Sequence, residues 1–231
     1  MTPIIDSEDA ARAWIAAQPG VSRETMQALE RLVAFVVDEA RHQNLVSAAT
    51  LATMWQRHIL DSAQLLRFAD PQPDELWIDL GSGAGFPGLV IALMAPCRVV
   101  LIESRSLRIA YLERAIAHLG LEGTTTVAGA ALDRVDAVEA NYISARAFAP
   151  LPRLLDGAER FSTEKTRWLL PKGRNARAEL ESMSSAWQRV FHVEQSLTDP
   201  DAAILVGTGR ATPPATPQPA RHRPIRRHRS R

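Results

Sequence analysis

A glycine-rich segment at residues 81–88 is the part of the chain whose residue types most clearly suggest chemistry. It directly follows the strand-like run 76–80, and its sequence is Gly-Ser-Gly-Ala-Gly-Phe-Pro-Gly. Glycine has no Cβ, so it permits positive φ angles and lets a ligand approach the main chain closely. Pro87 suits the first turn of a helix, where its missing N–H leaves nothing unpaired. The order of strand, glycine turn and helix therefore predicts a cofactor loop that contains Gly81, Gly83 and Gly85.

Glycine spacing alone allows two kinds of cofactor. Gly83, Gly85 and Gly88 match the G-x-G-x-x-G pattern of dinucleotide-binding proteins, which would make the chain an NAD(P)-dependent oxidoreductase. Asp79 precedes the loop. A carboxylate there suits organising the loop and meeting the cationic methionine end of S-adenosylmethionine, but it is an unfavourable neighbour for a pyrophosphate. We therefore favour S-adenosylmethionine and keep the oxidoreductase as the alternative.

Glu103 lies at the end of the next predicted strand, 18 residues after Gly85. A carboxylate at that position can accept hydrogen bonds from both ribose hydroxyls, a role common to both cofactor types. It therefore supports a nucleoside pocket without choosing between them. The structural alternatives are a solvated carboxylate at a strand end and a tight turn without a ligand. Three glycines in five residues would destabilise the fold without a compensating ligand site, which argues against the turn without a ligand.

After Pro73, short apolar runs alternate with helical patterns, which predicts βαβ units and a parallel sheet. We expect strands at 76–80, 98–103, 124–128, 142–145 and 167–170, helices at 87–94, 107–119, 151–159 and 175–187, and a closing hairpin at 190–195 and 203–206. Earlier helical patterns occur at 7–18, 22–44 and 51–67, with Ser22 as a plausible N-cap. The expected fold is α/β: a Rossmann-like class I S-adenosylmethionine-dependent methyltransferase fold with an N-terminal helical region.

The composition is that of an ordinary globular chain, with 46% apolar and 23% charged residues. The apolar run 89–95 ends at Pro96, far short of the roughly 20 residues that cross a membrane, and the N-terminus lacks a signal pattern. A single cysteine, Cys97, and the lack of a Cys/His cluster predict no metal site. We expect a cytoplasmic monomer without metal or membrane segment.

We divide the chain into an N-terminal helical region at 1–70 packed on the core, a cofactor-binding domain at 71–209 and a tail at 210–231. Residues 211–231 contain five prolines, six arginines and no acids, which predicts disorder. Because those six arginines belong to the 27 basic residues, positions 1–210 carry 21 basic and 26 acidic side chains, a net charge of −5.

Five segments occur in a fixed order along the chain: NLVS at 44–47, RHILDS at 57–62, DLGSGAGFPGLVIAL at 79–93, SARAF at 144–148 and PKG at 171–173. In this order and spacing, residues 22–208 resemble the bacterial ribosomal RNA small subunit methyltransferase G family, also called glucose-inhibited division protein B. The resemblance implies methyl transfer from S-adenosylmethionine to N7 of a guanine in the 530 loop of 16S rRNA. The implied partner is 16S rRNA, a 30S subunit or an assembly intermediate.

The resemblance also implies cofactor contacts, which fall on Gly81, Phe86, the pair Ala131 and Leu132, and Arg146. Leu132 departs from the family, which usually has an acidic residue there. If backbone groups recognise the adenine, Leu132 is tolerated. If the carboxylate matters, either Asp133 substitutes for it or the affinity falls.

Reasoning from the reaction is consistent with this acceptor. Carbon-5 methylation of a pyrimidine needs a cysteine nucleophile, and Cys97 lies at the opposite edge of the predicted sheet. Exocyclic amine methylation usually goes with an Asn/Asp-Pro-Pro-aromatic turn, which SARAF replaces. Guanine N7 already exposes a lone pair and needs no general base. Arg146 and Lys172, at the ends of the fourth and fifth strands, are the candidate catalytic residues, with plain surface cations as the alternative.

Several side chains keep two interpretations. His58 and Asp61 share a helix face, where they brace each other or the pocket. Phe86 or Phe148 either stacks on a base or simply packs. An acidic body is unexpected for an RNA enzyme, so the basic tail is either an RNA contact or a solvated appendage. A noncatalytic RNA-binding protein is the remaining alternative function.

Overall fold

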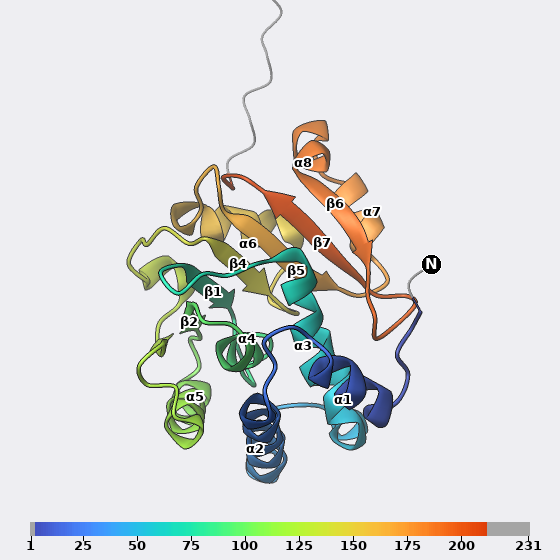
Figure 1. The fold of residues 1–231 in the computed structure, drawn as a ribbon. Coiled ribbons are helices and arrows are strands. Elements are labelled where there is room, and N and C mark those ends of the chain that lie inside the picture. The colour runs from blue at the N-terminus through green and yellow to red at the C-terminus, as the bar shows by residue number, and fades with distance from the viewer. Residues whose placement is uncertain (1–2, 212–231) are drawn as a thin grey trace, which may run out of the picture.

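The computed structural model describes residues 3–211, which form one seven-stranded sheet in the order β3-β2-β1-β4-β5-β7-β6 (Figure 1). The first five strands in this order are parallel, and β7 runs antiparallel to both β5 and β6. The strands are β1 (Leu76–Leu80), β2 (Arg98–Ile102), β3 (Thr125–Ala128), β4 (Tyr142–Ala145), β5 (Arg167–Lys172), β6 (Phe191–Gln195) and β7 (Ala203–Thr208). All predicted strands are present, including the closing hairpin.

The strand order reverses beside β1, which pairs with β2 on one side and β4 on the other. Leu80, the last residue of β1, lies opposite Ile102 and Ala145, the last residues of those neighbours. The loops that follow the three strands therefore open at the same edge of the sheet. In open α/β sheets, ligands bind in the crevice at such a reversal.

Helices cover both faces of the sheet (Figure 1). The first apolar cluster joins one face to α1 (Glu8–Ala16), α2 (Arg23–Glu39), α4 (Gly88–Met94) and α5 (Ser106–Leu119). The second joins the other face to α6 (Leu151–Ala158), α7 (Ala176–Glu181) and α8 (Ser185–Val190). Consecutive residues of β5, Trp168 and Leu169, belong to different clusters, as the two-residue period of a strand requires. The arrangement confirms the predicted α/β fold.

The N-terminal helices begin where the sequence predicts them. Ser7 and Ser22 each accept a backbone N–H through the side-chain oxygen, at 3.2 Å, which caps α1 and α2. Ile15 and Leu32 are fully buried in the same apolar cluster as Leu89 of α4. The region before residue 70 thus shares its core with the sheet.

The prediction of one regular helix over 51–67 is wrong. This stretch passes through a 3₁₀ turn, η1 (Ala48–Thr53), a π-helical turn, η2 (Trp55–Leu60), a single α turn, α3 (Asp61–Ala63), and a second 3₁₀ turn, η3 (Gln64–Phe68). A tertiary contact fixes the start of η2, because the Glu8 carboxylate accepts the backbone N–H groups of Trp55 and Gln56 at 3.0 and 2.8 Å. π-helical turns are frequent at functional sites.

The prediction of one continuous helix over 175–187 is also wrong, because this stretch is split into α7 and α8. The Ser182 hydroxyl donates to the Glu179 carbonyl, and Ser184 is extended, with φ −60° and ψ 154°. Serine side chains compete in this way with helical hydrogen bonds.

At the C-terminal end, the Ala211 N–H donates to the Ser162 hydroxyl at 2.8 Å. The tail prediction for 212–231 lies outside the described residues. Within residues 3–211, no helix is long and apolar enough to cross a membrane.

Candidate active site

The glycine loop follows β1 and lies against the end of β2. Gly81, Gly83 and Gly85 have φ angles of 66°, 55° and 87°, a region that favours glycine. The Gly81 N–H donates to the Ile102 carbonyl at 2.8 Å, and the Gly83 N–H donates to Glu103 Oε2 at 3.1 Å. The loop is therefore held on the neighbouring strand by its own backbone.

Glu103, which directly follows β2, holds this loop through its carboxylate, and only 3% of its surface is exposed. Its Oε1 accepts the backbone N–H groups of Ser104 and Arg105 and the Arg105 Nε–H; its Oε2 accepts Gly83 N–H and Arg105 Nη2–H at 3.1 Å each. Burial acts to raise the pKa of Glu103, but these hydrogen bonds outweigh it and hold the pKa below its ordinary value. The group is thus an ionised acceptor at neutral pH.

Asp79 lies behind the loop, fully buried. Its carboxylate accepts the Ser144 hydroxyl at 2.7 Å and the Gly88 N–H at 3.3 Å, which links β1 to β4 and to the start of α4. Burial raises the pKa of Asp79 to about 6. The carboxylate organises the loop from inside and has no surface toward a cavity.

A cavity of about 310 Å³, which we call the donor pocket, opens beside the loop. Its lining consists of Gly81, Ile102, Glu103, Ser104, Arg105, Ala130, Leu132, Ala147 and Phe148. A Cβ placed on Gly83 would have no protein atom closer than 3.7 Å, so the space beside the loop is open. An ionised carboxylate beside an uncovered glycine backbone fits a ribose-bearing cofactor.

Leu132 reaches the donor pocket, but part of its side chain packs on α6. A Cβ on Gly157 would lie 2.9 Å from Leu132 Cδ2. The neighbouring Ala131 lines a wider groove of about 1060 Å³ that adjoins the donor pocket. Packing on α6 gives this leucine a structural role at the position where the family usually has an acid.

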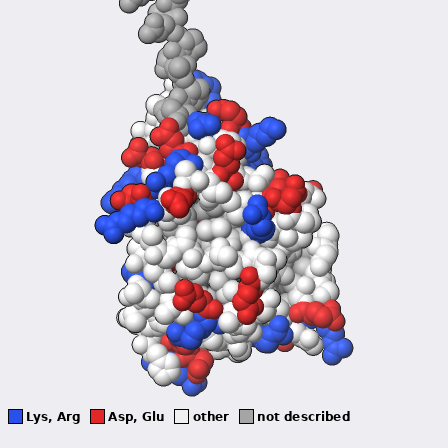
Figure 2. All heavy atoms as spheres, turned by 90° about the vertical axis from the view of Figure 1, so that its left-hand side faces the viewer, with Lys and Arg blue, Asp and Glu red and all other residues white. Residues whose placement is uncertain are grey.

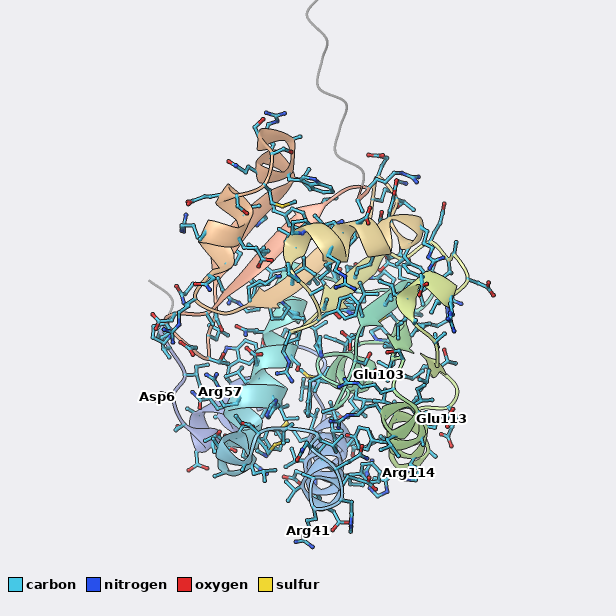
Figure 3. The ribbon with its side chains drawn as sticks, turned by 180° about the vertical axis from the view of Figure 1, so that it is seen from behind. Asp6, Arg41, Arg57, Glu103, Glu113 and Arg114 are labelled. Carbon is cyan, nitrogen blue, oxygen red and sulfur yellow. The ribbon has the colours of Figure 1, made fainter. Side chains whose placement is uncertain are left out.

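A second cavity of about 340 Å³, the acceptor pocket, lies at the ends of β4 and β5. Both predicted catalytic residues, Arg146 and Lys172, line it, together with Arg57, His58 and Asp61 of the RHILDS segment. Arg57 projects from η2 and Glu103 from the end of β2 in Figure 3. The structure thus brings together residues from distant parts of the chain.

Each cation of the acceptor pocket is paired with an acid. The ion pairs are Arg146 with Asp61 at 3.4 Å, Lys172 with Glu179 at 3.0 Å, and Arg57 with Asp199 at 3.1 Å. The Arg146 and Lys172 side chains are only 23% and 14% exposed. The pocket therefore offers both donors and acceptors, which suits a base edge better than a bare phosphate.

His58 is held on both ring nitrogens. Arg146 Nη2 donates to its Nδ1 at 3.2 Å, so the Nε2–H donates to the Thr50 hydroxyl at 3.0 Å. Burial and the charges of Arg146 and Arg57 lower the pKa of His58 to about 3. Its ring stacks on Phe86 at 5.0 Å between centroids. Phe86 is 3% exposed and lines neither pocket, so it braces the acceptor pocket from behind.

Two contributors have no sequence motif. Gln64 is fully buried and ties η3 to the loop after β6, because its Nε2 donates to Asp61 Oδ1 at 2.9 Å and its Oε1 accepts the Leu197 N–H at 2.7 Å. The Thr198 hydroxyl donates to the same Asp61 oxygen at 3.0 Å. They orient Asp61, and through it Arg146.

Comparison with known proteins decides the family. The model of the rRNA small subunit methyltransferase G family matches residues 25–202. The chain belongs to this family. Relatives named ribosomal RNA small subunit methyltransferase G include those of Sphingopyxis alaskensis, 50% identical over 91% of this chain and 90% of the relative, and Erythrobacter litoralis, 51% identical over 90% and 99%.

Solved structures agree on the fold. A SAM-dependent methyltransferase from Aquifex aeolicus has a TM-score of 0.52 at 14% identity, covering 74% of this chain and 99% of its own. An RNA methyltransferase from Salinibacter ruber, solved with S-adenosyl-L-homocysteine, has a TM-score of 0.52 at 14% identity, covering 67% and 94%. The predicted family, fold and methyltransferase class are confirmed. Within residues 3–211, no group of three or more His, Cys, Asp or Glu side chains could hold a metal ion.

Proposed function

We propose that this protein transfers a methyl group from S-adenosylmethionine to N7 of a guanine in the 530 loop of 16S rRNA. The observation that carries the proposal is the contact between the two pockets, whose linings share Ala147 and Phe148. A donor held at Glu103 would face an acceptor held at Arg146 and Lys172. Membership of a methyltransferase family favours this cofactor over a nicotinamide dinucleotide.

The acceptor chemistry matches the groups present. When bound, S-adenosylmethionine supplies a methyl group that leaves its sulfonium sulfur as the guanine N7 lone pair forms the new C–N bond, with no proton released. The residues therefore need to orient the base and exclude water rather than remove a proton. His58 fits this requirement, since both its nitrogens are engaged. Cys97 is 1% exposed, and burial raises its pKa to about 11, so it serves as no nucleophile.

The residues take distinct roles under this proposal. Glu103 accepts the ribose hydroxyls, while the backbone of Gly81, Gly83 and Gly85 lies against the cofactor. Asp79 and Phe86 hold the loop and the pocket wall from behind. Ala131 and Leu132 contact the adenine through backbone groups. Arg146 and Lys172 donate to the guanine, with its O6 as the natural acceptor.

The surface suggests a localised RNA contact. On the face in Figure 2, acidic and basic side chains are interspersed and do not form one basic field. Residues 1–210 carry a net charge of −5, so few phosphates are neutralised and we expect a shallow salt dependence of RNA binding. We propose a cytoplasmic monomer that acts on 16S rRNA within a 30S subunit or an assembly intermediate.

The test uses purified protein, labelled S-adenosylmethionine, and both 30S subunits and naked 16S rRNA from cells that lack the modification. We expect one methyl group, mapped to N7 of a guanine in the 530 loop. No incorporation into either substrate would contradict catalysis. Calorimetry with S-adenosylhomocysteine and NADH provides the parallel test, and binding of NADH alone would support the oxidoreductase instead.

A further inference from the structure

Phe148 stands where three cavities meet. It lines the donor pocket, the acceptor pocket and the wider groove beside them, and within residues 3–211 no other residue lines all three. Its side chain is also the one aromatic ring among the exposed large apolar side chains of the described chain, at 38% exposure. An exposed ring at a junction of cavities is positioned to contact a ligand in any of them.

The ring lies directly over the first glycine of the cofactor loop. A Cβ on Gly81 would lie 2.3 Å from Phe148 Cδ2, so the ring occupies the space in which that glycine has no side chain. The preceding residue, Ala147, has a φ of 50°, a conformation that L-residues other than glycine rarely adopt. Backbone strain of this kind persists where surrounding structure enforces it, and it clusters at ligand-binding sites.

A base bound in the acceptor pocket needs a flat apolar side chain to stack on. Its cations and acids serve the polar edge of the base, and the imidazole of His58 is already stacked on Phe86 at 5.0 Å. Phe148 is the one phenyl ring in the lining of that pocket. Proteins that bind unstacked RNA bases commonly hold them against such a ring.

We propose that Phe148 is the stacking residue for the acceptor guanine, and that it covers the Gly81 side of the donor pocket until the cofactor displaces it. The inference rests on the proposed methyl transfer to a guanine. The ring therefore opposes cofactor entry slightly and favours base binding strongly. This gives it opposite effects on the two ligands, which a residue that only packs the pocket wall would not have.

The experiment compares Phe148→Ala, Phe148→Leu and Phe148→Tyr with the unaltered full-length protein. Affinity for S-adenosylhomocysteine is measured by calorimetry, and kcat/KM is measured on unmodified 30S subunits at saturating S-adenosylmethionine. Leu107→Ala is the matched control, because Leu107 is a large apolar side chain, 73% exposed, that lines none of the three cavities.

We expect kcat/KM to fall by roughly 5- to 150-fold in Phe148→Ala, the effect of losing one base–aromatic stack, and to recover in Phe148→Tyr but not in Phe148→Leu. Affinity for S-adenosylhomocysteine should be tighter in the alanine variant, because the ring no longer covers Gly81, and Leu107→Ala should match the unaltered protein in both measurements.

Full activity of Phe148→Ala, rescue by leucine, or a parallel loss of cofactor affinity would each overturn the stacking role. If the unaltered protein methylates no guanine, the proposed function itself fails, so the two failures are distinguishable.

Discussion

The two pockets are built by opposite means. The donor pocket depends on atoms that are absent, because Gly83 has no side chain and leaves its backbone uncovered beside Glu103. The acceptor pocket depends on atoms that are present, because Arg146 and Asp61 hold their positions through a network of side-chain hydrogen bonds. Adding atoms should therefore damage the first pocket, and removing atoms should damage the second.

The pockets also differ in how the chain supplies them. The carboxylate of the donor pocket and the glycine loop beside it follow two neighbouring strands, β2 and β1. The acceptor pocket draws on η2, β4, β5 and the loop after β6, which are far apart in the sequence. A defect in the acceptor pocket can therefore arise from a substitution outside its lining, such as one at Gln64.

The largest expected effect comes from adding atoms to the glycine loop beside the donor pocket. Gly83→Val should weaken binding of S-adenosylhomocysteine by at least about 100-fold, because the branched side chain would fill the space beside Glu103. The fold should survive, since a Cβ there meets no protein atom within 3.7 Å. Calorimetry and thermal unfolding measure the two effects.

Gly120→Val is the matched control for backbone strain. Gly120 has a φ of 71° and no atom within 4 Å of an added Cβ, and it lines neither pocket. The same left-handed backbone strain should destabilise this variant by about 1 to 2 kcal/mol, while its affinity for S-adenosylhomocysteine is unchanged. If Gly83→Val still binds S-adenosylhomocysteine, the loop has another role.

Removing atoms from the acceptor pocket gives the next effect. Arg146→Ala should lower kcat/KM for methyl transfer by on the order of 100-fold, because it loses contacts to His58, Asp61 and the Arg57 carbonyl that fix the pocket geometry. Arg146→Lys should not rescue it, since an ammonium group lacks the planar fork that reaches these acceptors together. Steady-state kinetics on unmodified 30S subunits provide the measurement.

The same variant tests whether the pockets are separate. Affinity of Arg146→Ala for S-adenosylhomocysteine should change by less than about tenfold, since Arg146 lines only the acceptor pocket of the two. A loss of cofactor affinity as large as the loss in kcat/KM would support the contact between Arg146 and the cofactor that the family resemblance implies. The two pockets would then not be separate.

The contrast explains which parts the sequence could predict. Asp79, the glycines and Glu103 lie on consecutive strand ends, so local pattern was enough to group them. The strands were predictable because their apolar runs are short and end in turns. The acceptor pocket needed the RHILDS, SARAF and PKG resemblance, since nothing in composition or periodicity brings residue 58 next to residue 146.

The failures have the same physical origin. Local propensity favours a regular helix over 51–67, but the Glu8 carboxylate holds the backbone of Trp55 and Gln56 from a distant segment. Thr198 and Asp199 lie in a polar loop with no motif, and they enter the site only because the pairing of β6 with β7 places this loop beside the pocket. Such contacts are properties of the assembled fold.

Asp79 gives a pH-dependent effect on stability. Its folded pKa is raised to about 6, above the ordinary value, so the folded state holds a proton that the unfolded state has lost. The protonated side chain therefore contributes fully to the free energy of unfolding below about pH 4, and this contribution is lost as pH rises to about 6. Above that pH, the free energy of unfolding is lower by up to about 3 kcal/mol. Asp79→Asn should remove this slope and raise the thermal midpoint at pH 7.5 by several degrees.

Thermal unfolding of both proteins from pH 4 to pH 8 isolates the Asp79 contribution as a difference. Because the carboxylate has no surface toward the donor pocket, affinity of Asp79→Asn for S-adenosylhomocysteine should fall by less than about tenfold. A larger loss would mean that its charge acts on the cofactor directly, as the sequence interpretation allowed.

The smallest effect concerns Arg105, whose side chain donates hydrogen bonds to the Glu103 carboxylate. Five N–H donors already satisfy its two oxygens, and two of them belong to the Arg105 guanidinium, which is 65% exposed. Ribose hydroxyls must replace those two, so Arg105→Ala should tighten binding of S-adenosylhomocysteine. Because the Arg105 side of this ion pair is mostly exposed to solvent, the pair contributes about 1 kcal/mol, which limits the gain to about fivefold. Calorimetry at low and high salt should show the gain shrinking as salt screens the pair in the unaltered protein. Weaker binding in the variant would mean that Arg105 contacts the cofactor itself, and the donor pocket would then also depend on a side chain that is present.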